Sequence, residues 1–181
     1  PNPPRPKKHS PMSEQRSPST ARLIRHGALE IDTWRLFDAP RDDSPTSPAD
    51  EPGWIVPLPL WSMQRETLHQ RRHPVAVQLE PDADLQTLLD TEKDLASSPF
   101  AFIAINFPVY TDGRGYSLAQ LLRTRYGYQG ELRAVGDVMI DTIHYQARVG
   151  FDSFLVKAGH DPEQAVAAFN AFTGHYQKTY P

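Results

Sequence analysis

The sequence predicts an α/β fold of four consecutive βα units with a mainly parallel sheet, preceded by a small β-hairpin. From residue 74 onward, short apolar runs alternate with segments in which leucines and aromatic residues recur at helical spacing. Because the units follow one another directly, they require right-handed crossovers and parallel strands. Two closures fit this pattern: a half-barrel-like arrangement, which the short and regular units favour, and a flavodoxin-like open sheet.

Composition divides the 181 residues into four stretches. Residues 1–19 are rich in Pro and Ser and are expected to be a disordered tail, because they cannot bury much apolar surface. Residues 20–37 form the predicted β-hairpin, and residues 38–53 are acidic and Pro-rich and indicate a flexible linker. Residues 54–181 are assigned to the α/β domain.

Local signals place the individual elements. The hairpin turns at His26-Gly27, and Trp34, Leu36 and Phe37 are expected to continue its second arm. A helix over residues 62–72 ends before Pro74. The strands of the four units are predicted at 75–79, 100–107, 131–135 and 151–156, and the candidate N-caps of the helices that follow them are Asp82 or Asp84, Ser117, Asp137 and Asp161.

Composition also excludes several classes of function. The chain has no cysteine, which excludes disulfides, thiol catalysis and thiolate metal sites. The net charge of -3 gives no global reason to expect nucleic acid or an anionic membrane as a partner. The basic residues near the amino terminus are not followed by the apolar run of a secretory signal, and no run has the length of a membrane span. A cytoplasmic location is therefore expected.

The stretch Asp112-Gly113-Arg114-Gly115-Tyr116-Ser117 lies between a predicted strand and a predicted helix, where α/β proteins bind ligands. Its glycines let a ligand approach the backbone, Arg114 supplies a planar cation, and Ser117 is placed to cap the helix. Amide groups at the helix start favour an anion. The other interpretation is a tight turn with a capped helix and a structural arginine.

Polar residues of the neighbouring units should meet at the same edge of the sheet. Lys157 is expected to join Gly113, Arg114, Gly115 and Ser117 in an anion-binding site, and Asp137 is the candidate acid or base. A structural role remains open for each of these residues. Arg114 would then pair with Asp137, or Asp137 would cap the following helix.

A second charged group is predicted to support the fold rather than to catalyse. Arg133 lies inside a strand, so it needs a partner, which Glu131 on the same side or Asp141 on the next helix can supply. Together with Asp112, these residues form the expected supporting network. Arg123 and Arg125 are placed on the exposed side of a helix.

Metal and cofactor motifs give no positive signal. His69 and His73 stand four residues apart at a helix end, but the glutamate of the metalloprotease pattern is missing, so no metal site is predicted. The sequence contains no Gly-x-Gly-x-x-Gly, Walker loop or Gly-x-Ser-x-Gly, and no cofactor is predicted.

The segment from Phe107 to Ser117, FPVYTDGRGYS, resembles the signature of a bacterial family of uncharacterised proteins encoded beside assimilatory sulfite reductase and often labelled probable oxidoreductases. The likeness covers roughly residues 75–175. It continues through residues 121–123, 126–128, 130–134, 136–138 and 150–152. The resemblance implies sulfur assimilation. Many relatives carry a cysteine where Val149 stands here, so thiol chemistry in those relatives would not carry over.

Three functions remain open. The favoured one is an accessory protein that supports sulfite reductase, with the reductase or its electron donor as partner and without thiol chemistry of its own. The second is an enzyme or sensor that binds a small oxyanion in the loop from Asp112 to Ser117. The third is a flavin- or nicotinamide-dependent oxidoreductase, and any enzyme activity is expected to be an oxidoreduction linked to sulfite reduction. A homodimer is one way to cover the sheet edges, and the hairpin is another.

Overall fold

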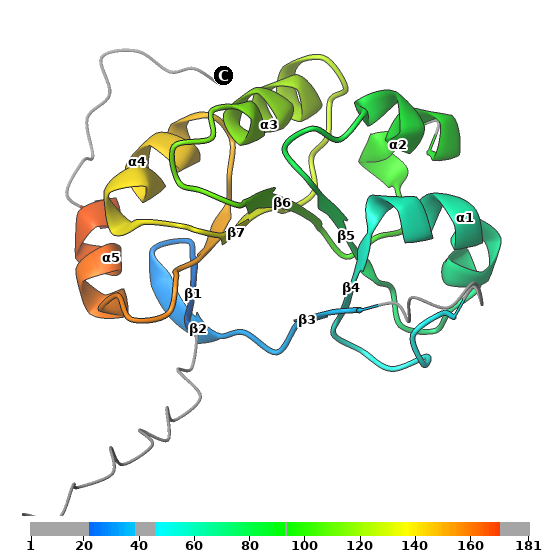
Figure 1. Ribbon diagram of the computed structural model, residues 1–181, viewed down its shortest axis with the longest axis horizontal. Helices are drawn as coiled ribbons and strands as arrows, with labels where there is room; N and C mark the ends of the chain where they lie inside the picture. Colours follow the sequence, from blue (N-terminus) through cyan, green and yellow to red (C-terminus); the bar gives the residue numbers. More distant parts are fainter. Residues whose placement is uncertain (1–21, 39–45, 93, 171–181) are drawn as a thin grey trace, which may run out of the picture.

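The computed structural model describes residues 22–38, 46–92 and 94–170 of the chain, and Figure 1 shows the arrangement. All strands of these residues belong to one sheet in the order β2-β1-β8-β7-β6-β5-β4-β3. The strands are β1 (Arg22–Arg25), β2 (Ala28–Ile31), β3 (Arg35–Leu36), β4 (Trp54–Pro57), β5 (Ala76–Leu79), β6 (Ile103–Phe107), β7 (Leu132–Gly136) and β8 (Ser153–Leu155). The helices are α1 (Leu58–His69), α2 (Leu85–Thr91), the short 3₁₀ turn η1 (Leu95–Ser97), α3 (Arg114–Thr124), α4 (Ile140–Arg148) and α5 (Pro162–Asn170).

The sheet is a half-barrel. Strands β3 to β8 are parallel and lie side by side in the order in which the chain makes them, which differs from the reversed order of a flavodoxin-like sheet. The helices lie along its outer side (Figure 1). The hairpin of β1 and β2 pairs antiparallel with β8 and covers that edge. The predicted βα units, parallel sheet and amino-terminal hairpin are confirmed.

The two edges of the sheet are joined by a very short connection. Strand β2 forms one edge and β3 the other, and only residues 32–34 separate them. Four Cα steps span at most about 14 Å, so the sheet has to curl until its edges lie within about that distance of each other here. Figure 1 shows this segment passing along the open side of the half-barrel.

The prediction that Trp34, Leu36 and Phe37 continue the hairpin is wrong. Arg35 and Leu36 form β3, which pairs parallel with β4 at the other end of the sheet. The change of direction has a local cause, because Oδ1 of Asp32 accepts the Trp34 N–H at 3.1 Å and so makes a turn just after β2.

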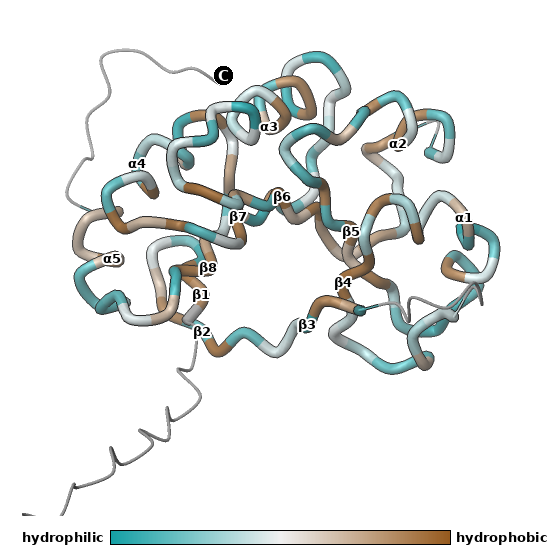
Figure 2. The backbone as a smooth tube through the Cα atoms, in the orientation of Figure 1, coloured by the Kyte–Doolittle hydropathy of each residue, from teal (hydrophilic) through white to brown (hydrophobic). Residues whose placement is uncertain are grey.

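Hydrophobic residues are frequent along the strands of the curved sheet (Figure 2), and their buried side chains form two cores. The main core lies between the strands and the outer helices and includes Trp61, Phe107 and Phe154. A smaller core lies on the inner face, where Ile55, Ala76, Phe102, Ala104 and Val135 are buried. Trp34 packs edge-on against Phe102 with the ring centroids 4.8 Å apart, so the connecting segment closes this inner core.

Helix boundaries differ most from expectation where proline and tertiary contacts decide them. Helix α1 begins at Leu58, before the predicted residue 62, because Pro57 is its N-cap and a second proline lies in its first turn, where no N–H is needed. The predicted caps Asp84 and Asp161 are confirmed, since each accepts a backbone N–H at 2.9 Å.

The part of the predicted linker at 46–53 is held in place by Arg71, which donates to the carbonyls of Pro48 and Ala49. The expected tail at 1–19 lies outside the described residues.

Candidate functional site

The predicted site lies at the carboxyl ends of the parallel strands. Asp112 and Arg114 follow β6, Asp137 follows β7 and Lys157 follows β8, which places all four at the carboxyl-terminal end of the half-barrel. The topology therefore brings the predicted residues to one end of the sheet. Their contacts show how each of them is held.

Arg114 is bound within its own loop. Its Nε and Nη2 donate to the two carboxylate oxygens of Asp112 at 3.0 and 2.7 Å, and the same carboxylate accepts the Arg114 N–H at 3.1 Å. The bidentate bond lowers the pKa of Asp112 and raises that of Arg114. Arg114 remains 62% exposed, but its charge is already compensated. The open alternative of an Arg114–Asp137 pair is not the arrangement found.

Asp137 pairs with Lys157 instead. The Lys157 ammonium lies 2.7 Å from Oδ1 of Asp137, and the other carboxylate oxygen accepts the Tyr110 N–H at 3.1 Å. The hydrogen bond from Lys157 contributes most to lowering the pKa of Asp137, and the hydrogen bond from the Tyr110 N–H lowers it further. Helix α4 has Met139 as its N-cap, so Asp137 does not cap it. Asp137 thus ties the loop after β6 to the loop after β8.

The two glycines of the loop have different roles. A Cβ on Gly115 would lie 2.7 Å from the ring of Phe107, so Gly115 allows the start of α3 to pack closely on β6. A Cβ on Gly113 would meet no atom within 4 Å. Gly113 is also the N-cap of α3, and Ser117 lies inside the helix, so the prediction that Ser117 caps it is wrong.

Between β6 and this helix, the loop exposes apolar side chains. Pro108, Val109 and Tyr110 are all exposed, Val109 to 52% and Tyr110 to 49%. The loop is nevertheless held in shape, because Asp137 fixes Tyr110 N–H and the Asp112 N–H donates to the Val109 carbonyl at 3.0 Å. We call residues 108–111 the exposed loop.

An acidic groove lies at the carboxyl ends of β4 and β5, on the β5 side of the loop that follows β6. It has a volume of about 500 Å³ and is lined by the first turns of α1 and by the segment that leads into α2. Glu80, Asp82 and Asp84 belong to its lining. The Asn106 amide at the end of β6 donates to Glu80 at 2.7 Å, which links the groove to the neighbouring strand. Sequence reasoning missed this groove as a site, although Asp82 and Asp84 were considered as helix caps.

Buried charges form a second network on the inner face of the sheet. Arg133 is fully buried and donates to Glu131 at 2.9 Å and to Asp32 at 3.1 Å, with its guanidinium carbon 3.8 Å from the centre of the Phe102 ring. Ser153 also donates to Glu131 at 2.6 Å. Burial raises the pKa of Glu131, but the bond from Ser153 and the charge of Arg133 outweigh it and leave the pKa below its ordinary value of 4.5.

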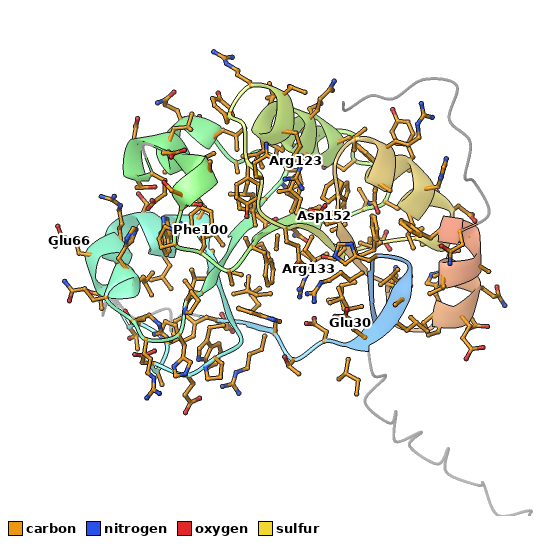
Figure 3. All side chains as sticks on the ribbon, turned by 180° about the vertical axis from the view of Figure 1, so that it is seen from behind. Glu30, Glu66, Phe100, Arg123, Arg133 and Asp152 are labelled. Atoms are coloured by element: carbon orange, nitrogen blue, oxygen red, sulfur yellow. The ribbon has the colours of Figure 1, made fainter. Side chains whose placement is uncertain are left out.

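This network confirms the predicted Arg133–Glu131 pair and identifies a partner that the sequence did not suggest. Asp32, 101 positions away in the chain, takes the place considered for Asp141, which is exposed at the start of α4. In Figure 3, Arg133 lies next to the hairpin that carries Glu30. The network holds the connecting segment against β7.

The prediction that Arg123 lies on the exposed side of its helix is wrong. Arg123 is only 6% exposed. Its guanidinium donates to the carbonyls of Gly150, Tyr128 and Gly130 at 2.7 to 3.1 Å and pairs with Asp152. Figure 3 shows Arg123 and Asp152 close together beneath α3. Helical spacing could not reveal this role, because the acceptors lie on loops distant in sequence.

The two histidines considered for metal binding have other partners. His69 lies 2.7 Å from Glu92, and His73 lies 3.3 Å from Asp50. Within the described residues, no cluster of three or more His, Asp or Glu side chains has an arrangement that would hold a metal ion. No helix in the described part of the chain is long and apolar enough to cross a bilayer.

Comparison with known proteins identifies one family. No curated protein and no solved structure matches the chain. The family described as "Bacterial protein of unknown function (DUF934)" matches residues 76–181, which is more than half of the chain and extends from β5 past α5. It thus includes the loop after β6 and the pairs formed by Arg114 and Lys157. The chain belongs to this family of bacterial proteins.

Proposed function

We propose that the protein is an accessory protein of sulfur assimilation that docks onto sulfite reductase, or onto its electron donor, through the carboxyl end of its sheet. The connection to sulfur rests on the resemblance of the Phe107–Ser117 signature to a family encoded beside sulfite reductase. The docking role rests on the exposed loop within that signature.

The exposed loop is the observation that carries the proposal. The buried part of the signature is accounted for by packing, since Phe107 and Gly115 fit against each other. Val109 and Tyr110 have no such role and present apolar surface to solvent. Tyrosine is enriched at the centres of protein interfaces, and the fully buried part of an interface is more apolar than the rest of a protein surface. Because the backbone of the loop is already fixed, little ordering entropy would be lost on binding.

The charges around the loop support a protein partner over a small oxyanion. Both cations of the predicted anion site, Arg114 and Lys157, are already bound to carboxylates. An oxyanion would therefore compete with Asp112 for Arg114, in a neighbourhood where Glu80 and Asp82 add further negative charge. Oxyanion binding remains the alternative, and Arg114→Ala tests it by titration with sulfite and sulfate.

The test of docking compares two tyrosines of similar exposure. Tyr110 on the exposed loop is 49% exposed, and Tyr145 on α4 is 51% exposed. We expect Tyr110→Ala to weaken binding to purified sulfite reductase roughly tenfold or more, as for an aromatic residue at the centre of an interface. Tyr145→Ala, the matched control, should bind as the wild type does. Biolayer interferometry with the immobilised full chain measures both.

Three results would count against the proposal. Absence of binding by the wild type to both the reductase and its electron donor would rule out the docking role. Equal affinities of the two tyrosine variants would remove the loop from the interface. A purified protein that carries a flavin absorbance band, or that binds a nicotinamide nucleotide, would favour the oxidoreductase instead.

A further inference from the structure

The groove at the carboxyl ends of β4 and β5 combines apolar surface with negative charge. One side is formed by Pro57, Pro59 and Met63, and the Met63 side chain is 74% exposed. The other side carries Glu80, Asp82 and Asp84. The volume of about 500 Å³ lies in the range of sites that accept a small molecule or a large side chain.

The negative charge of the groove is not compensated by its own lining. Glu80 accepts hydrogen bonds from the neutral amides of Gln78 and Asn106, at 2.9 and 2.7 Å. Asp84 accepts a backbone N–H at the start of α2. None of the described residues that line the groove is basic. The carboxylates at the neighbouring strand ends differ in this respect, because Asp112 and Asp137 are ion-paired.

Asp82 is the carboxylate of this group that is free to meet a ligand. Within the described residues, its side chain takes part in none of the hydrogen bonds and ion pairs found at this end of the sheet, whereas Glu80 and Asp84 hold local structure. The nearby cation Arg114 acts on Asp82 only through space, since it is bound to Asp112. Asp82 is exposed and can be replaced without disturbing the core.

We propose that this groove receives the side chain of an arginine or lysine from a partner protein. The aliphatic part of such a side chain would lie against Met63 and the two prolines, and its charged end would meet Asp82. Charge complementarity selects this occupant, because the groove offers carboxylates and apolar surface and no basic group. The identity of the partner rests on the proposed function, whereas the chemistry of the groove does not.

The chemistry of the groove is tested first on the full chain alone. n-Butylguanidinium chloride, a mimic of an arginine side chain, is titrated into isotopically labelled protein and followed by NMR. We expect saturable shifts of the Met63 methyl and Ala83 amide signals, and weaker binding by Asp82→Asn and by Met63→Ala. Sodium butanesulfonate, which has the same apolar stem and a negative charge, should give no saturable shift. If n-butylguanidinium gives none either, the assignment is wrong.

The partner is tested with the reductase, in an experiment that separates the two proposals. Asp82→Asn should lower the affinity roughly fivefold to tenfold, with a larger effect at low salt. Asp90→Asn, in the last turn of α2, removes the same charge away from the carboxyl ends of the strands and should bind as the wild type does. If the wild type binds the reductase and Asp82→Asn binds it with the same affinity, the groove assignment is wrong and the docking role still holds. If the wild type does not bind, the docking role fails, and the titration decides the groove.

One other occupant would overturn the assignment. The segment 1–19 contains Arg5, Lys7, Lys8 and Arg16, so it has the required charge. If removing these residues shifts the Met63 methyl signal of the ligand-free protein, and n-butylguanidinium then shifts it back toward its position in the full chain, the groove is filled by the chain itself. An unchanged Met63 signal after removal would support the partner assignment.

Discussion

Replacing Asp32 with alanine should destabilise the protein by opening the connection that joins the two edges of the sheet. The Asp32 carboxylate is 6% exposed and has two functions. It pairs with the fully buried guanidinium of Arg133 at 3.1 Å, and it accepts the Trp34 N–H at the turn after β2. The substitution removes both interactions and enlarges no cavity in the main core.

The magnitude follows from these two contacts. Breaking a buried ion pair costs about 3 to 5 kcal/mol when the remaining charge is left unpaired. Glu131 still compensates Arg133 here, so the loss should be smaller than that range. A hydrogen bond to a charged group contributes about 1.5 to 3 kcal/mol and the turn bond to Trp34 about 1 kcal/mol. We therefore expect Asp32→Ala to lower the free energy of unfolding by about 2 to 4 kcal/mol.

Urea denaturation followed by tryptophan fluorescence measures this change, with Glu30→Ala as the control. Glu30 also pairs with an arginine of the hairpin, Arg25, at 2.8 Å, but both side chains are partly exposed, at 41% and 27%. Such a pair contributes about 0 to 1 kcal/mol. An Asp32→Ala protein as stable as Glu30→Ala would refute the view that the segment 32–34 closes the half-barrel.

Two further predictions concern Gly115 and Glu131. Gly115→Ala should lower the free energy of unfolding by about 1 to 3 kcal/mol, because the added Cβ overpacks against Phe107. Gly113→Ala should be nearly neutral, because a Cβ there meets no atom within 4 Å. Thermal unfolding distinguishes the two variants, and equal melting temperatures would contradict the packing role of Gly115. The lowered pKa of Glu131 gives stability that is present above its ordinary value of 4.5 and is lost as the pH falls through the folded-state pKa. Urea midpoints of the wild type and Glu131→Gln should therefore converge in acid, and a constant difference would exclude this contribution.

Much of the fold could be predicted because its signals are local. The caps Asp84 and Asp161 and the hairpin turn at His26-Gly27 depend on residues within a few positions of one another. His26 and Gly27 both have positive φ, as a two-residue hairpin turn requires. The Arg133–Glu131 pair was accessible for the same reason, since alternate residues of a strand share a face.

What could not be predicted depends on contacts between distant segments. The half-barrel brings Asp32 to Arg133 across 101 positions, and no local pattern indicates that pairing. Arg123 looks like an exposed helical arginine until the carbonyls of Gly150 and Tyr128 are placed around it. At the candidate site, the strand order brings Arg114 and Asp137 to the same end of the sheet. Each of them nevertheless forms an ion pair with another residue, Arg114 with Asp112 and Asp137 with Lys157.

Recovery of sulfite reductase with the tagged full chain from its host tests whether the carboxyl end of the half-barrel is a docking surface, with Val109 and Tyr110 on its exposed loop. We predict that the wild-type chain retains the reductase or its electron donor at moderate salt and that Tyr110→Ala loses it. Recovery of neither protein by the wild type, even at low salt, would show that the chain does not dock onto them.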